Sequence, residues 1–456
     1  MKQAVETVNP ATGEKLASYP MMSREDTMKV AKEVKGAFEK WRRISISERA
    51  GHLLELARVL RNHKNAYARL MTSEMGKPIT QSESEVEKCA WTAEVYAQRT
   101  EKWLEDEVAT TDAKLAYVTF DPLGTVLSVM PWNFPFWQAL RFAIPALTAG
   151  NTSLLKHASV STGSSLAIEG AFREAGYPES VFRSLIIDHE VAAELIAGPL
   201  VQGVSLTGSV QAGERIAALA GANLKKFVLE LGGSDPFIVL DDADVEAAAR
   251  TAADARLVNS GQSCIAAKRF IVQEAAAKEF TELMVRAFEK KVVGDPMDAK
   301  TDVGPLVSSG AVSDVDAQVK DAVSKGAREA LHGGPRPGKG AYFEPIILVG
   351  IRKDMRVAGE EVFGPAAPVM PVKSEDEAIQ IANDSEFGLG ASLWTTNLQK
   401  AKDLAHRIES GMVFVNNLVK SDPRVPFGGV KKSGIGRELS GYGLKEFVNV
   451  KTVSIF

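Results

Sequence analysis

The sequence predicts an α/β protein with two tandem Rossmann-like units, each built on a parallel sheet. Two observations support the paired units. Short apolar runs alternate with amphipathic helical stretches, which is typical of parallel sheets covered by helices. The alternation begins near residue 125 and starts again near Phe237, and 456 residues are enough for more than one domain.

The chain before residue 125 is expected to be mostly helical. Apolar residues recur at helical spacing from residue 23 to about 107, and Ser23 is a candidate N-cap. Residues 115–120 then have the composition of a strand, which the Pro-Gly turn 121–124 ends.

The two alternating series are expected to supply one sheet each. The first gives strands at 125–130, 152–155, 181–187 and 203–206, with helices that include 139–147 and 161–175. The second gives strands at 237–240, 269–272, 346–349, 367–371 and 411–415, with helices that include 245–255 and 375–383. Open sheets of this kind bind ligands beyond the carboxyl ends of their strands.

Composition narrows the possible classes of protein. A net charge of -4 argues against a general nucleic-acid binder. No apolar run reaches the ~18 residues of a membrane helix, and the N-terminus lacks the pattern of a signal peptide. The two cysteines, Cys89 and Cys264, form no disulfide framework, which fits the cytoplasm. The six scattered histidines show no zinc spacing, so we expect no metal.

Three residues are candidates for catalysis. Cys264 follows a glycine turn and is a possible nucleophile, although a cysteine taken alone is more often structural. Glu230 ends an apolar strand, where burial would raise its pKa and suit it to proton abstraction; a capping role is the alternative. Asn133 lies in a stiff turn between two prolines, where its side-chain amide could donate to an oxyanion. The alternative is that Asn133 is present only because asparagine favours turns.

The segment 207–213 has the order strand, glycine turn, helix. Free N–H groups at such a helix N-terminus can bind a pyrophosphate. It is not a P-loop, because Glu214 follows Gly213 where lysine would be required. Taken alone, this is a weak indication of a nucleotide site.

Taken together, these segments resemble the aldehyde dehydrogenase superfamily over nearly the whole chain. Eight matching segments occur in the family's order, namely 9–13, 131–135, 155–156, 207–213, 229–233, 261–264, 360–365 and 426–431. Within the superfamily, segments 231–237 and 431–439 are most similar to bacterial succinate-semialdehyde dehydrogenases.

The resemblance implies a covalent mechanism. Cys264 would attack the aldehyde, Asn133 and the Cys264 N–H would stabilise the oxyanion, and Glu230 would activate the water that hydrolyses the thioester. The residues implied to hold the nicotinamide cofactor are Trp132, Lys156, Ser159, Gly208, Ser209, Gly213, Glu361 and Phe363. Because Glu230 is present, a dehydrogenase that transfers the acyl group to coenzyme A is disfavoured.

The same resemblance gives expectations for cofactor and substrate. Ser159 stands where NAD-preferring relatives carry glutamate, so we expect NADP to be preferred, with some NAD activity. Arg141, with Ser421 and Phe427, would bind the substrate and its far carboxylate. Many relatives carry a second arginine where this chain has Val258, and the candidates to replace it are Arg256, Arg424 and Ser421. Glutarate semialdehyde and uncharged aldehydes remain alternative substrates.

The resemblance also implies a division of the chain. Residues 1–103 and 123–232 would bind the cofactor, with 432–446 returning to them, and residues 233–431 would form the catalytic domain. Residues 104–122 and 447–456 would form an arm whose strand edges pair with another subunit, giving a homodimer or homotetramer.

Overall fold

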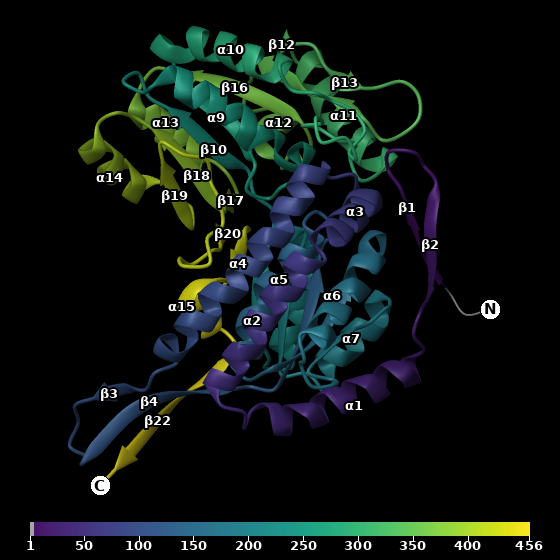
Figure 1. The fold of residues 1–456 in the computed structure, drawn as a ribbon. Helices are drawn as coiled ribbons and strands as arrows, with labels where there is room; N and C mark the ends of the chain where they lie inside the picture. Colours follow the sequence, from purple (N-terminus) through teal and green to yellow (C-terminus); the bar gives the residue numbers. More distant parts are fainter. Residues whose placement is uncertain (1–3) are drawn as a thin grey trace.

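Two mainly parallel sheets organise the computed structural model, which describes residues 4–456 (Figure 1). The first sheet has six strands, and only its edge strand β21 is antiparallel to its neighbour. The strands, in spatial order, are β21 (Gly434–Ile435), β9 (Lys226–Glu230), β8 (Gly203–Thr207), β5 (Thr125–Met130), β6 (Thr152–His157) and β7 (Phe182–Ser184).

Helices cover both faces of the first sheet. One core lies beneath α2 (Ile46–Asn62), α4 (Ile79–Trp103), α5 (Pro135–Thr148) and α6 (Thr162–Glu174). Another lies beneath α1 (Arg24–Trp41), α7 (His189–Ala197) and α8 (Val210–Ala222). All 14 residues of α5 are buried. Polar side chains on α5 therefore need partners within the protein.

The second sheet has seven strands and forms the other half of the molecule. Its strands, in spatial order, are β12 (Arg328–Leu331), β15 (Ile346–Val349), β16 (Ala366–Val372), β11 (Ala267–Gln273), β10 (Asp235–Val239), β18 (Gly390–Trp394) and β19 (Met412–Val415). Only β12 is antiparallel to its neighbour. The associated helices are α9 (Val245–Leu257), α10 (Glu274–Glu289), α11 (Ser309–Ser324), α12 (Arg356–Gly359), α13 (Glu375–Asn383) and α14 (Leu398–Arg407).

Smaller elements complete the chain. They are β1 (Ala4–Val8), β2 (Lys15–Pro20), α3 (Lys64–Met75), the 3-10 turns η1 (Ser159–Ser161) and η2 (Val258–Gly261), β13 (Gly334–Pro335), β14 (Phe343–Glu344), β17 (Phe387–Gly388), β20 (Val430–Lys431) and α15 (Ser440–Leu444).

The α/β fold class is confirmed, but several strands were absent from the sequence expectations. Residues 390–394 form the strand β18, between β10 and β19, although Gly390, Ala391 and Ser392 have little strand propensity. Pairing on both sides outweighs that local preference. The antiparallel hairpin β1–β2 was also not expected.

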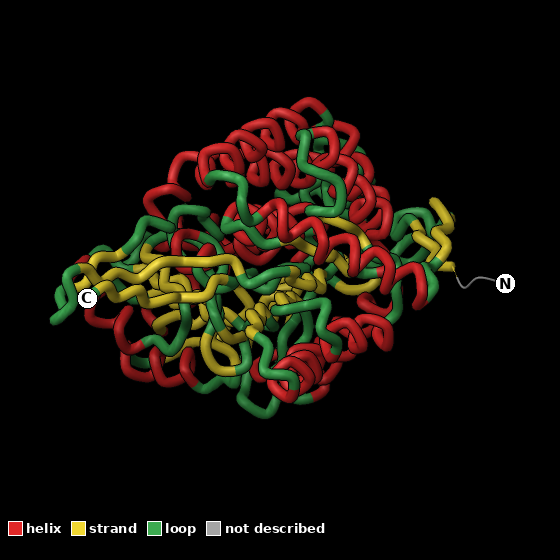
Figure 2. Tube along the Cα trace, turned by 90° about the horizontal axis from the view of Figure 1, so that it is seen from below, coloured by secondary structure: helices red, strands yellow, loops and turns green. Residues whose placement is uncertain are grey.

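A three-stranded arm extends away from the two halves, beside the C-terminus (Figures 1 and 2). It comprises β3 (Glu107–Ala109), β4 (Leu115–Pro122) and β22 (Val448–Ile455), all antiparallel. Several apolar side chains on it are exposed, including Val108, Val450 and Phe456. Uncovered apolar strands of this kind are usually paired with another chain.

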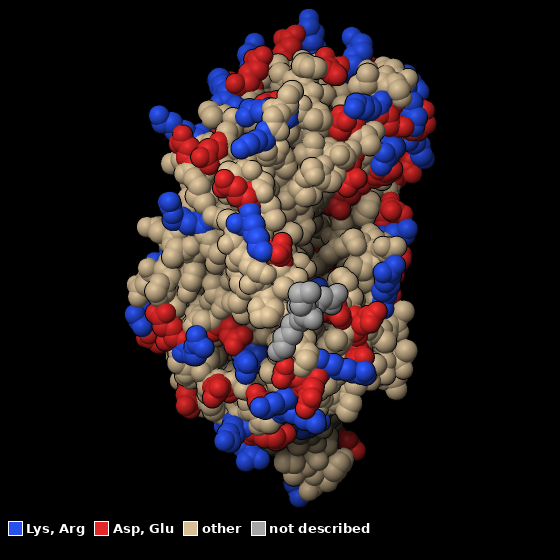
Figure 3. Space-filling model, turned by 90° about the vertical axis from the view of Figure 1, so that its right-hand side faces the viewer, with Lys and Arg blue, Asp and Glu red and all other residues tan. Residues whose placement is uncertain are grey.

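The surface carries both signs of charge. Figure 3 shows Lys and Arg interspersed with Asp and Glu over one face of the molecule. Within residues 4–456, no helix is long and apolar enough to cross a membrane. In the same range, no group of three His, Cys, Asp or Glu side chains is arranged to hold a metal ion.

Candidate active site

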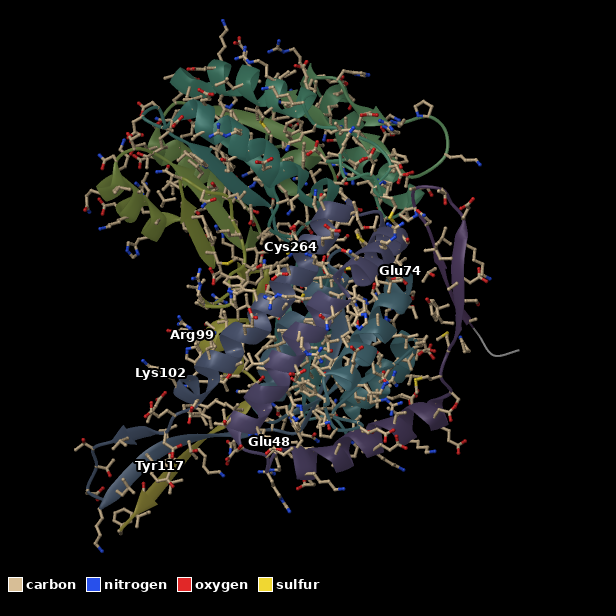
Figure 4. All side chains as sticks on the ribbon, viewed as in Figure 1. Glu48, Glu74, Arg99, Lys102, Tyr117 and Cys264 are labelled. Carbon is tan, nitrogen blue, oxygen red and sulfur yellow. The ribbon has the colours of Figure 1, made fainter. Side chains whose placement is uncertain are left out.

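Cys264 lies where the two halves of the molecule meet (Figure 4). It lines a cavity of about 420 Å³, together with residues from α4, α5, the end of α9 and the loop after β19. Each of α4 and α5 contributes four residues at positions i, i+3, i+4 and i+7, which is one face of a helix. They are Gln81, Ser84, Glu85 and Lys88 on α4, and Phe134, Trp137, Gln138 and Arg141 on α5.

The loop that presents Cys264 has an unusual backbone. Asn259, Ser260 and Gly261 have φ angles of 50°, 56° and 80°, in the left-handed region. Two consecutive non-glycine residues in that region are unfavourable unless other contacts hold them. A Cβ on Gly261 would lie 2.4 Å from the Gly364 carbonyl, so only glycine permits this close approach.

Two buried cations hold the loop through its carbonyl groups. Arg256 donates to the carbonyls of Gly261, Ala267 and Val362, at 2.8, 2.9 and 3.1 Å. Lys268 donates to the Cys264 carbonyl at 2.6 Å and to the Ser263 carbonyl at 2.8 Å. The candidate role of Arg256 in replacing a substrate-binding arginine is therefore wrong, because its guanidinium binds main-chain oxygens.

The protonation of Cys264 depends on its surroundings. Burial raises the pKa of the Cys264 thiol to about 12, although the charges of Arg141 and Lys268 act in the opposite direction. Cys89 is fully buried in α4, and burial raises the pKa of its thiol well above the usual value. Cys264 is therefore the thiol that a molecule in the cavity can reach.

Asn133 is joined to the Cys264 loop by side-chain hydrogen bonds. Its amide nitrogen donates to the Gln262 carbonyl at 3.1 Å, and Asn259 donates to the Asn133 carbonyl at 2.7 Å. The amide group of Asn133 has a second N–H. These hydrogen bonds place the side-chain amide of Asn133 beside the residues that immediately precede Cys264.

Glu230 is at the carboxyl end of β9, 2% exposed, and neither of its carboxylate oxygens has a hydrogen-bond partner among the described residues. Burial raises the pKa of Glu230 well above its usual value, and repulsion from Glu438 adds to this. An ideal Cβ on Gly428 would lie 2.7 Å from Oε1 of Glu230, so the glycine leaves room beside the carboxylate.

Arg141 lies on α5, between the cavity and the carboxylates of Glu230 and Glu438. It forms an ion pair with Glu438, donates to Thr207 at 3.3 Å, and stacks 4.6 Å from the centre of the Phe427 ring. Only 1% of Arg141 is exposed. Its charge lowers the pKa values of Glu230 and Cys264, against the larger effect of burial.

The segment 207–213 forms the expected turn at the start of α8. Ser209 is the N-cap, and its side chain accepts from Ala212 N at 3.3 Å. A Cβ on Gly213 would lie 2.6 Å from the Leu231 side chain, so glycine lets the helix approach this residue closely. Gly208 has no such constraint, because a Cβ on it would lie 3.6 Å from the Leu206 side chain, an ordinary contact distance.

Lys156 and Ser159 lie at the carboxyl end of β6. Lys156 is 6% exposed, and burial lowers the pKa of its ammonium. Ser159 is exposed in η1, and its hydroxyl does not cap α6. Instead Glu74 accepts from the backbone of Gly163 and Ser164, at 2.7 and 3.0 Å. Ser159 is thus free of the capping role that was its structural alternative.

The remaining cofactor candidates surround the Cys264 loop. Trp132 and Phe363 meet edge to face, with their ring centres 5.9 Å apart. Glu361 accepts from Gly233 N at 3.0 Å and lies 3.4 Å from Lys268 Nζ. The protein itself therefore already supplies partners for this carboxylate.

The substrate candidates divide into two groups. Arg141, Ser421 and Phe427 line the cavity with Cys264, and so does Val258. Arg424 does not line it; it forms an ion pair with Asp422 at 2.6 Å. Arg424 as a replacement for the second arginine is therefore wrong.

Sequence reasoning missed several residues of the site. Lys88 lines the cavity and donates to Ser421 Oγ at 2.5 Å, although 333 positions separate them. Lys268 and Arg256 bind the Cys264 loop from a strand and a helix of the second half. For Lys88 there was one local indication, its place on the same helical face as Ser84 and Glu85.

Comparisons with known proteins show which family the whole chain resembles. The model of the aldehyde dehydrogenase family matches residues 1–453. A probable succinate-semialdehyde dehydrogenase [NADP(+)] of Synechocystis is 46% identical over 99% of this chain and 100% of that protein. A succinate semialdehyde dehydrogenase [NAD(P)+] of Escherichia coli is 43% identical, over 98% and 97%.

A solved structure resembles the whole chain. The succinic semialdehyde dehydrogenase of Streptococcus pyogenes, in complex with NADP+, gives a TM-score of 0.96 at 39% identity, and the match covers 99% of this chain and 100% of that one. These likenesses extend over both sheets and the Cys264 loop. The chain belongs to the aldehyde dehydrogenase family.

Proposed function

We propose that this protein oxidises succinate semialdehyde to succinate with NADP+, and more slowly with NAD+. The observation that carries the substrate assignment is the cavity itself, in which the Cys264 thiol shares the space with the cationic side chains Arg141 and Lys88. Positive charge in a partly apolar cavity favours an aldehyde with a carboxylate at its far end. The relatives from Synechocystis and Escherichia coli, which are named succinate-semialdehyde dehydrogenases, support the same substrate.

Cys264 is the proposed nucleophile. After the Cys264 thiol gives up its proton to water, the thiolate forms a bond to the aldehyde carbon, and the carbonyl oxygen becomes an oxyanion that accepts from the Asn133 amide and the Cys264 N–H. Bound NADP+ supplies the hydride acceptor. Loss of hydride from the former aldehyde carbon leaves a thioester on Cys264, which the loop holds in place through Lys268 and Arg256.

Glu230 is the proposed base for hydrolysis. It takes a proton from water, the resulting hydroxide attacks the thioester carbon, and the bond to sulfur breaks to release succinate. A raised pKa suits this role, because a more basic carboxylate is a better proton acceptor. The carboxylate has no hydrogen-bond partner to lose when it turns toward the water.

The ends of β6 and β8 suit the proposed cofactor. Lys156 and the exposed Ser159 offer a cation and a hydroxyl to a 2′-phosphate, with no carboxylate at position 159 to repel it. Ser209 at the start of α8, with Gly208 and Gly213, would receive the pyrophosphate. Trp132, Glu361 and Phe363 would lie beside the nicotinamide end of the cofactor.

The proposed organisation assigns residues 1–103, 123–232 and 432–446 to cofactor binding and residues 233–431 to catalysis. The arm of 104–122 and 447–456 is proposed to pair with another copy, because its strand edges and apolar side chains are exposed. Two free cysteines are compatible with a cytoplasmic site of action.

A substrate and cofactor panel tests the proposal. The values of kcat/KM are measured for succinate semialdehyde, glutarate semialdehyde, butanal and benzaldehyde, each with NADP+ and NAD+. We expect the highest value with succinate semialdehyde and NADP+. A higher value for glutarate semialdehyde or for an uncharged aldehyde would reassign the substrate, and a higher value with NAD+ would reassign the cofactor.

A further inference from the structure

Lys88 is the least neutralised cation in the interior of the Cys264 cavity. Four cationic side chains line the cavity: Lys88, Arg141, Lys291 and Lys420. Arg141 is ion-paired with Glu438, and Lys291 is ion-paired with Asp254 at 2.8 Å. Lys420 is exposed. Lys88 is half-buried and forms no ion pair with the described residues.

The contacts of Lys88 hold its ammonium without neutralising it. Nζ lies 4.3 Å from the centre of the Trp137 ring and donates to Ser421 Oγ at 2.5 Å. The neighbouring carboxylate of Glu85 is already bound by Lys77 and accepts from Trp137 N at 2.8 Å. An ammonium has three donors, so donors of Lys88 remain for a ligand in the cavity.

We propose that Lys88, with Ser421, binds the far carboxylate of the substrate directly and contributes more to this binding than Arg141, which lines the same cavity but is ion-paired with Glu438. The inference rests on the proposed oxidation of succinate semialdehyde. It follows from the difference between the two cations. Glu438 pairs with the charge of Arg141, whereas Lys88 contacts only a neutral hydroxyl and an aromatic ring.

The charge of Lys88 is sensitive to pH. Burial lowers the pKa of its ammonium to about 8, and the charge of Arg141 on α5 also lowers it. Cys89 and Glu85 on α4 and Asp422 after β19 act in the opposite direction. A lysine is charged below its pKa, so affinity for a carboxylate is expected to fall as the pH rises through about 8.

The test compares Lys88→Met, Lys88→Arg and the control Lys102→Met, which changes an exposed lysine near the end of α4 outside the cavity. Steady-state kinetics are measured with succinate semialdehyde, its uncharged methyl ester and butanal. A hydrogen bond to a charged group predicts a rise in KM of about 10–100-fold for succinate semialdehyde in Lys88→Met. The KM for the ester and butanal should change less than about threefold, as should all three values in Lys102→Met.

Lys88→Arg gives a second measurement. An arginine stays charged, so the KM for succinate semialdehyde should rise between pH 7 and 9 in the wild-type protein but change much less in Lys88→Arg. Equal losses on all three aldehydes, or an unchanged KM in Lys88→Met, would overturn the proposal and leave Lys88 a packing residue.

Product inhibition separates this inference from the proposed function. Succinate is added while butanal is oxidised, and its inhibition constant is measured for the wild-type protein and for Lys88→Met. If the wild-type protein does not prefer succinate semialdehyde, the proposed function fails. Inhibition by succinate that weakens about 10–100-fold in Lys88→Met would still support a carboxylate site at Lys88. Equal inhibition of the two proteins would contradict it.

Discussion

The Cys264 loop and the strand ends of the first sheet use polar groups in opposite ways. In the loop, the main-chain N–H of Asn259 and the main-chain carbonyls of Gly261 and Cys264 are each bound by a side chain from outside the loop. At the strand ends, the carboxylate of Glu230 is buried without a hydrogen-bond partner. The comparison indicates that the loop is fixed in position, while the strand ends keep polar groups free to exchange protons or bind ligands.

Burying the carboxylate of Glu230 without a hydrogen-bond partner has a cost in folding free energy. A buried polar group without a partner is unfavourable by roughly 1–3 kcal/mol. At Glu230 that cost takes the form of a raised pKa, since the neutral carboxylic acid is easier to bury than the carboxylate. A group of this kind is retained where its protonation state has to change, and such groups cluster at functional sites.

The largest expected effect is at the nucleophile. Cys264→Ala should abolish dehydrogenase activity, because no thiol remains in the cavity, while binding of NADP+ is retained. Activity is followed by the absorbance of reduced cofactor, and cofactor binding by calorimetry. Cys89→Ala is the matched control and should keep dehydrogenase activity, since Cys89 is fully buried in α4. Loss of activity in Cys89→Ala alone would reverse the assignment.

The second effect is at the base. Glu230→Gln should still produce a burst of about one reduced cofactor per site, followed by steady-state turnover slowed by ~10²–10⁴-fold. The amide cannot accept a proton from water, whereas formation of the thioester does not need this base. Rapid-mixing measurements separate the two phases. A variant without a burst would place Glu230 before hydride loss, and unchanged turnover would remove it from the mechanism.

The direction of the pH dependence follows from the raised pKa of Glu230. Burial is the main cause, and repulsion from Glu438 adds to it. Only the deprotonated carboxylate accepts a proton, so the hydrolysis rate of the wild-type protein should increase as the pH rises through that pKa. The increase should be absent in Glu230→Gln, and a wild-type rate independent of pH would contradict the assignment.

The third effect tests whether Arg256, which lies outside the Cys264 loop, stabilises the backbone conformation of that loop. Arg256→Met removes the donors to Gly261, Ala267 and Val362, which should lower the free energy of unfolding by about 3 kcal/mol and slow catalysis. Calorimetric unfolding and the burst rate are both measured. Arg256→Lys keeps the charge and part of the bonding, so it should lose less. If both variants matched the wild type, the loop would hold its left-handed backbone without Arg256.

The sequence identified the proposed reacting residues better than the residues that position them. Cys264, Glu230 and Asn133 lie in short local patterns, a glycine turn, a strand end and a proline-stiffened turn, which can be recognised within a few residues. Arg256 and Lys268 were not identified as loop supports, because their partners are main-chain oxygens, which every residue carries and which therefore leave no pattern in the sequence.

The same distinction explains the errors in the fold and the cavity. The weak strand β18 is set by its neighbours β10 and β19, which are distant in sequence. Lys88 and Ser421 are joined across 333 positions, so no spacing argument links them. Arg424 was a reasonable candidate from its place before Phe427, but Asp422, two residues earlier, pairs with it.

The smallest expected effect lies at the strand end of β6. Ser159→Glu places a carboxylate near Lys156, where it would repel a 2′-phosphate and accept from the ribose hydroxyls of NAD+. Ser159 is exposed and does not cap α6, so the substitution should leave the fold intact. The ratio of kcat/KM for NADP+ to that for NAD+ should fall about tenfold, equivalent to ~1.4 kcal/mol. Ser159→Gln is the matched control for size without charge, and its ratio should change much less. An equal fall in both variants would attribute the effect to bulk, and an unchanged ratio in Ser159→Glu would show that this strand end does not select the cofactor.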